Sequence, residues 1–86
     1  MTWEELVKRE PRLADLLAEV QTVSSVGNPH FCANAVWSRQ FKPRLFRLVG
    51  WFSESEDPYL QTEDAYDVAH GKLYEALPAC RNCGCL

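Results

Sequence analysis

The sequence predicts a small all-α domain of four to five short helices, stabilised by a zinc ion, with one short strand or hairpin as an alternative for one of the helices. Apolar residues recur at helical spacing in several segments, turn-forming residues separate those segments, and three of the four cysteines lie in the final stretch "CRNCGCL". We expect residues 1–86 to form a single domain. A core of this size leaves a thin stability margin, so a covalent or metal cross-link is expected.

Two helices are predicted in the N-terminal part. Thr2 and Glu5 have the spacing of a capping box, which indicates a helix that begins at once and runs to about Arg9. Pro11 suits the first position of a second helix. That helix has an apolar stripe at positions i, i+3, i+4 and i+7, formed by Leu13, Leu16, Leu17 and Val20.

Turn-forming residues in segment 24–30, "SSVGNPH", interrupt the helical pattern. We expect a helix in "FCANAVWSRQF", with an apolar face made of Ala33, Val36, Trp37 and Phe41. Pro43 then predicts a fresh start, and the next segment continues the spacing with Leu45, Leu48, Val49 and Phe52. Segment 44–52 also has the composition of a short strand, and Gly50 weakens a helix, so both assignments stay open here.

The last predicted helix follows a loop rich in serine, acidic residues and proline. Thr62 is expected to cap the helix, and Glu63 and Asp64 in the first turn suit its positive end. The helix should end at about Leu77, before Pro78. Its expected buried stripe consists of Ala65, Val68 or Ala69, Leu73, Ala76 and Leu77.

Cysteine spacing predicts a structural zinc site. Cys80 and Cys83, followed by Gly84, have the Cys-x-x-Cys-Gly pattern in which two thiolates face one ion. The two further ligands are expected to be Cys85 and Cys32, so that tail 78–86 closes onto loop 28–32. His30 is the alternative ligand, and His70 is disfavoured by its place on a helix. Closure would contribute on the order of 10 kcal/mol, comparable to the stability of a small domain.

Three other roles for the cysteines stay open. Cys32 could be a small buried apolar residue, or it could form a disulfide with Cys80. The last four residues formally satisfy a C-terminal Cys-a-a-X box for prenylation, although glycine and cysteine replace its aliphatic middle positions. A thioredoxin-like relay is disfavoured because the Cys-x-x-Cys pair follows a predicted helix and ends the chain.

Charge is unevenly distributed along the chain. The formal net charge is −3, yet a basic segment, 39–47, precedes an acidic one, 53–70, which has six acidic residues and no lysine or arginine. The cations of the basic segment are Arg39, Lys42, Arg44 and Arg47. Because Trp37, Phe41, Phe46 and Trp51 are interleaved with them, nucleic-acid binding is one candidate function.

The composition favours a binding protein over an enzyme. We find no glycine-rich phosphate loop, no His-Glu-x-x-His and no Gly-x-Ser-x-Gly motif, and no catalytic residues are predicted. With no apolar run approaching about 18 residues and an acidic start, we expect a cytoplasmic protein without a membrane segment. The predicted function is that of a small zinc-binding adaptor or regulatory module whose partner is another protein, and nucleic acid is the alternative. The oligomeric state is not readable from the sequence.

Overall fold

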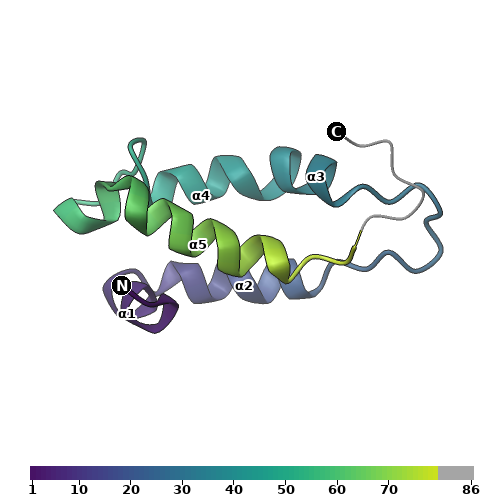
Figure 1. Cartoon of the computed structure of the whole chain (residues 1–86), viewed down its shortest axis with the longest axis horizontal. Coiled ribbons are helices and arrows are strands. Elements are labelled where there is room, and N and C mark those ends of the chain that lie inside the picture. Colours follow the sequence, from purple (N-terminus) through teal and green to yellow (C-terminus); the bar gives the residue numbers. More distant parts are fainter. Residues whose placement is uncertain (80–86) are drawn as a thin grey trace.

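The computed structural model describes residues 1–79 of the chain, and in this part the fold consists of helices, turns and loops without a strand. Figure 1 shows α5 running alongside α2 and α4, with α1 at one end of the molecule. The prediction of an all-α fold is therefore confirmed. The α-helices are α1 (Trp3–Arg9), α2 (Arg12–Gln21), α3 (Ala33–Val36), α4 (Lys42–Leu48) and α5 (Glu63–Glu75).

Local capping explains where α1 and α2 begin. Thr2 Oγ1 accepts a hydrogen bond from the backbone N–H of Glu5 at 3.3 Å, as the capping pattern predicted. Between the helices, the nearly buried carboxylate of Glu10 accepts hydrogen bonds from the backbone N–H of Arg12 at 3.2 Å and from its guanidinium at 2.8 Å. The Arg12 side chain, through these bonds, holds the pKa of Glu10 below its usual value. The pair fixes the corner at which α2 starts after Pro11.

The segment from Ala33 to Leu48 differs from the two separate helices predicted around Pro43. It is continuous, because a π-helical turn over Trp37–Phe41 links α3 directly to α4. The Lys42 N–H bonds to the Trp37 carbonyl five residues back, just before Pro43, which has no N–H to donate. The proline is thereby accommodated near the start of α4, and segment 44–52 is helical only as far as Leu48.

The core lies where α5 packs against α1, α2 and α4. The expected stripes supply most of it, although Leu17, Val36, Val68 and Ala76 are only partly buried. The buried apolar residues are Leu6, Leu13, Leu16, Val20, Phe31, Ala33, Trp37, Phe41, Leu45, Leu48, Val49, Leu60, Ala65, Ala69, Leu73 and Leu77. In residues 1–79, no helix is long and apolar enough to cross a membrane.

One expected core residue, Phe52, lies outside the core. Its side chain is 71% exposed, because α4 ends at Leu48 and the helical spacing that placed Phe52 in the buried stripe no longer applies. Val49 is extended and Gly50 has a φ of +89°, so the chain turns away from the helix axis. The Gly50 N–H then donates to the Leu60 carbonyl at 2.7 Å, which ties this turn to the segment before α5.

Gly50→Ala is expected to destabilise the protein by about 1 to 2 kcal/mol, because alanine disfavours a positive φ. Its Cβ would also meet the Tyr66 side chain at 3.4 Å. Gly71→Ala is the matched control: Gly71 lies within α5, an added Cβ would have open space within 4 Å, and a gain of about 0.5 to 1 kcal/mol is expected. Urea unfolding measures both variants. Equal effects of the two substitutions would contradict the conformational role of Gly50.

Candidate functional site

The predicted metal ligands are only partly within the described residues. Cys32 precedes α3, and its backbone carbonyl accepts the Val36 N–H at 3.1 Å. His30 is exposed, and its backbone N–H is bound by the Asn28 side chain at 3.0 Å. Cys80, Cys83 and Cys85 lie outside the described residues. Within residues 1–79, no group of three or more histidine, cysteine or acidic residues could hold a metal ion.

Cys32 is disulfide-bonded in the structure. A sulfur in a disulfide supplies no thiolate to zinc. Cys80, the disulfide partner considered from the sequence, lies outside the described residues, so that pairing stays a prediction. The zinc site itself stays a prediction.

Metal analysis distinguishes the two cross-links. If the zinc prediction holds, protein purified under reducing conditions without added zinc contains one zinc ion per chain, and chelation lowers its helical circular dichroism. Protein free of metal would contradict the prediction. A second sample purified without reductant, with an intact mass lower by the hydrogens lost on disulfide formation, would identify the disulfide as the cross-link. Cys32→Ser should remove the zinc site and the disulfide alike, so this variant does not distinguish them. The intact mass and metal content of the wild-type chain do.

The four basic residues 39–47 are exposed along the π-helical turn and α4. Arg44 is paired with Glu19 of α2, and the Lys42 Nζ lies 5.7 Å from the centre of the Phe46 ring. Two of the interleaved aromatic residues, Trp37 and Phe41, are buried in the core. The nucleic-acid alternative stays a prediction.

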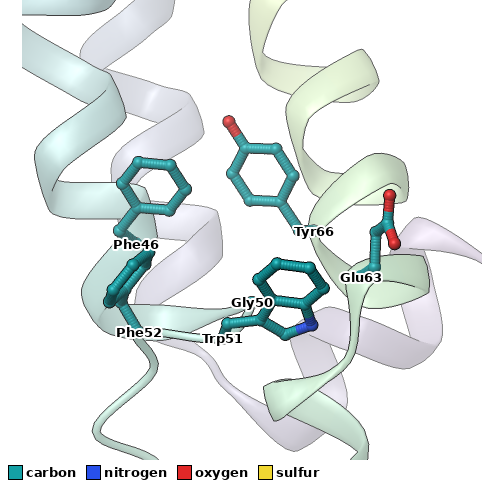
Figure 2. A pocket seen from close by; sticks show the side chains of 6 residues that line it. All are labelled: Phe46, Gly50, Trp51, Phe52, Glu63 and Tyr66. Carbon is teal, nitrogen blue, oxygen red and sulfur yellow. The ribbon is translucent and has the colours of Figure 1, made fainter.

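An exposed aromatic cluster lies at the end of α4, and we call it the aromatic corner: Phe46, Trp51, Phe52 and Tyr66. Trp51 is 77% exposed and Phe52 is 71% exposed. Phe46 stacks on Tyr66 with ring centroids 5.1 Å apart, and it meets the Phe52 ring edge-on at 5.5 Å. Figure 2 shows Trp51 below this pair, between Phe52 and Glu63.

The aromatic corner borders an apolar pocket of about 300 Å³. Gly50 forms part of its lining, and Glu63, from the first turn of α5, lines the side across from Phe46 and Phe52 (Figure 2). A volume of this size is at the lower end of the range for small-molecule sites and suits one large side chain. The pocket can therefore receive an apolar anchor.

Hydrogen bonds hold the loop that carries Trp51 and Phe52. The Ser53 N–H donates to the Gly50 carbonyl at 3.0 Å, which closes the turn around the two aromatic residues. The Ser53 hydroxyl donates to the Leu48 carbonyl at 3.0 Å and accepts the Ser55 N–H at 3.0 Å. The two aromatic side chains are thus presented to solvent by an ordered turn.

A second set of contacts fixes the far end of this loop. The Ser55 hydroxyl accepts the Asp57 N–H at 3.0 Å, and the Asp57 carboxylate accepts the Tyr59 N–H at 2.9 Å. Arg9 of α1 donates to both Asp57 oxygens, at 2.9 and 3.0 Å. The hydrogen bond from the Tyr59 N–H, more than the Arg9 pair, holds the pKa of Asp57 below its usual value. The loop is therefore anchored to α1 as well as to α4.

Stacked rings join the aromatic corner to the core along α5. His70 lies one turn beyond Tyr66, with ring centroids 5.7 Å apart, and Tyr74 follows at 5.6 Å. The buried Trp37 packs edge-on against His70 at 5.0 Å. Burial among these rings lowers the pKa of His70, with an opposing effect from Asp67 and a smaller lowering from Lys42.

We expect the free energy of unfolding to fall as pH decreases from about 7.5 to about 5.5. Because the folded pKa of His70 lies below its ordinary value, the unfolded chain binds the proton first and gains stability relative to the folded chain in this window. The window lies above the range in which Glu10 and Asp57 titrate. His70→Phe should flatten the dependence in urea unfolding measured at the two pH values. An unchanged slope in this variant would contradict the assignment.

Sequence reasoning missed the aromatic corner. It assigned Phe52 to the buried stripe and read Trp51 as a possible base-stacking residue of the basic segment. The available signal was Gly50 immediately before "WF", because a glycine that ends a helix leaves the next two residues outside the helical pattern.

No protein-family model, curated protein or solved structure matches this chain.

Proposed function

We propose that this protein is a small adaptor or regulatory module that binds another protein through the aromatic corner. The observation that carries the proposal is the exposure of Trp51 and Phe52 at the tip of a turn held by hydrogen bonds, beside an apolar pocket. Exposed aromatic residues are enriched among the side chains that dominate protein interfaces. Turns that only connect two helices usually consist of polar residues, glycine and proline, without two large aromatic side chains.

The cross-link at Cys32 has a structural role in this proposal, with zinc as the ion expected from the cysteine spacing. Cys32 precedes α3, whereas Trp51 and Phe52 of the aromatic corner follow the other end of the same continuous helical segment, beyond α4 (Figure 1). Binding at the corner therefore needs no ligand from the cysteines. Loss of the cross-link should weaken binding only through loss of the fold.

Peptide selection followed by NMR tests the proposal. Linear peptides selected from a random library for binding to the intact protein should shift the indole N–H signal of Trp51 when they are titrated in. The indole signal of Trp37, which is 3% exposed, should move little and serves as the internal control. Failure to select any peptide, or shifts confined to Arg39, Lys42, Arg44 and Arg47, would contradict docking at the aromatic corner.

A salt titration separates this proposal from nucleic-acid binding. Affinity for single-stranded DNA through residues 39–47 would fall steeply with salt, by about one unit of log-log slope for each phosphate contact. A protein partner held by apolar contacts should show weak salt dependence. Tight, salt-sensitive binding of DNA with no effect on the Trp51 signal would favour the alternative function.

A further inference from the structure

Glu63 places a carboxylate without a partner on the wall of the apolar pocket. It is exposed, and among residues 1–79 its side chain makes neither an ion pair nor a hydrogen bond. Three other acidic side chains have partners: Glu19 pairs with Arg44, Asp57 pairs with Arg9, and Asp64 accepts the Tyr59 hydroxyl at 2.7 Å. Glu63 differs from other exposed acidic residues, such as Glu54 and Glu56, by its place in the lining of this pocket. Glu63 is thus available to a cation brought by a ligand.

The charge around the pocket is polarised. Segment 53–70 contains six acidic residues and no lysine or arginine, and it forms the loop and the part of α5 that adjoin the pocket. On the Phe46 side lies Lys42, whose Nζ is 5.7 Å from the ring centre. A ligand that fills the pocket therefore meets negative charge at the Glu63 side and positive charge at the Phe46 side.

We propose, on the basis of the function proposed above, that the partner is a basic protein segment with one large apolar side chain adjacent to a lysine or arginine. The apolar side chain fills the pocket among Phe46, Trp51 and Tyr66. The neighbouring cation pairs with Glu63 at the edge of the pocket. Apolar burial supplies the affinity, and the ion pair selects the sequence and fixes its direction across the corner.

Charge also argues for a protein partner over a lipid surface. Exposed tryptophan and phenylalanine at a loop tip can insert at a membrane interface, but such contacts are reinforced by lysine and arginine next to the aromatic residues. Here the residues that follow the tip include Glu54, Glu56 and Asp57. Anionic lipid headgroups would be repelled by the same carboxylates that attract a basic segment.

A charge-reversal selection tests the proposal. The random peptide library is selected in parallel against the wild-type protein, Glu63→Lys and the control Glu75→Lys, which makes the same charge change near the other end of α5. Wild type and Glu75→Lys should enrich an apolar residue next to lysine or arginine, and Glu63→Lys should enrich apolar residues next to aspartate or glutamate. A wild-type peptide should bind Glu63→Gln about two- to fivefold more weakly, as expected for one exposed ion pair.

Lysine in the first turn of α5 interacts unfavourably with the helix dipole, so urea unfolding must show that Glu63→Lys is folded. Glu63→Gln tests the loss of the ion pair without adding a positive charge. Two results would overturn this inference and leave the proposed function standing. One is the selection of apolar peptides with no preference for a charged neighbour, and the other is a charge preference that is the same in Glu63→Lys as in wild type. If no peptide is enriched, this inference and the proposed function both fail. Binding to phosphatidylcholine vesicles, with or without phosphatidylserine, that is lost in Trp51→Ser would assign the corner to a membrane surface. Concentration-dependent dimerisation that is lost in the same variant would assign it to a second copy of the chain. Either result would overturn the inference.

Discussion

Trp37→Ala is expected to lower the free energy of unfolding by about 3 to 5 kcal/mol, a large part of the stability of a small domain. The side chain is 3% exposed and packs edge-on against His70 at 5.0 Å and Tyr74 at 5.8 Å. Its removal leaves a cavity where the π-helical turn meets α5. Urea unfolding followed by circular dichroism measures the loss.

Trp51→Ala is the matched control for this prediction, since the same residue type is 77% exposed at position 51. Its stability should change by no more than about 0.5 kcal/mol. If Trp37→Ala unfolds the protein entirely, Trp37→Phe keeps part of the ring contact and should give a measurable intermediate loss. Similar losses for positions 37 and 51 would contradict the division between core and surface tryptophan.

The double variant Trp51→Ser, Phe52→Ser is expected to lose at least about a hundredfold in affinity for a selected peptide while it keeps its fold. Burying the exposed parts of both side chains would release on the order of 5 to 9 kcal/mol before the costs of association. Neither side chain belongs to the buried core. The free energy of unfolding should therefore stay within about 1 kcal/mol of wild type.

Fluorescence anisotropy with a labelled peptide measures the affinity of this variant, and urea unfolding of the same sample measures its stability. The control is Phe31→Leu, which changes a buried aromatic residue outside the aromatic corner. That variant should lose stability and retain affinity under conditions in which it is folded. The reverse pattern would contradict the assignment of Trp51 and Phe52 to binding.

The helices were predictable because their signals are local. Thr62 caps α5 by accepting the Ala65 N–H at 3.2 Å, as the sequence pattern indicated. The i, i+3, i+4 stripe of α2 buries Leu13, Leu16 and Val20 as expected. Capping and hydrophobic periodicity depend on residues within one or two turns, so the sequence alone carries them.

The ends and joins of the helices were harder to predict. Pro43 was expected to break the chain into two helices, but a π-helical turn shifts the hydrogen-bond register so that the helical path continues. Phe52 has the spacing of a core residue, yet Gly50 with its positive φ ends the pattern first. A periodicity argument contains neither the change of hydrogen-bond register before Pro43 nor the bond from the Gly50 N–H to the Leu60 carbonyl that holds the turn.

The candidate site was predictable only in part. The uneven charge was visible in the sequence, and its acidic segment supplies Glu63 to the pocket. The pocket itself joins Phe46 of α4 with Tyr66 of α5, which lie twenty positions apart in the sequence. No local pattern connects these residues, so the aromatic corner emerges only once α4 and α5 are packed together.

A crystal structure of the protein bound to a selected peptide tests most directly whether the aromatic corner is a docking surface. We predict that one apolar peptide side chain lies in the pocket among Phe46, Trp51 and Tyr66, and that Trp51 and Phe52 become largely buried. A peptide bound along residues 39–47 or on another face, with Trp51 and Phe52 still exposed to solvent, would contradict docking at this corner.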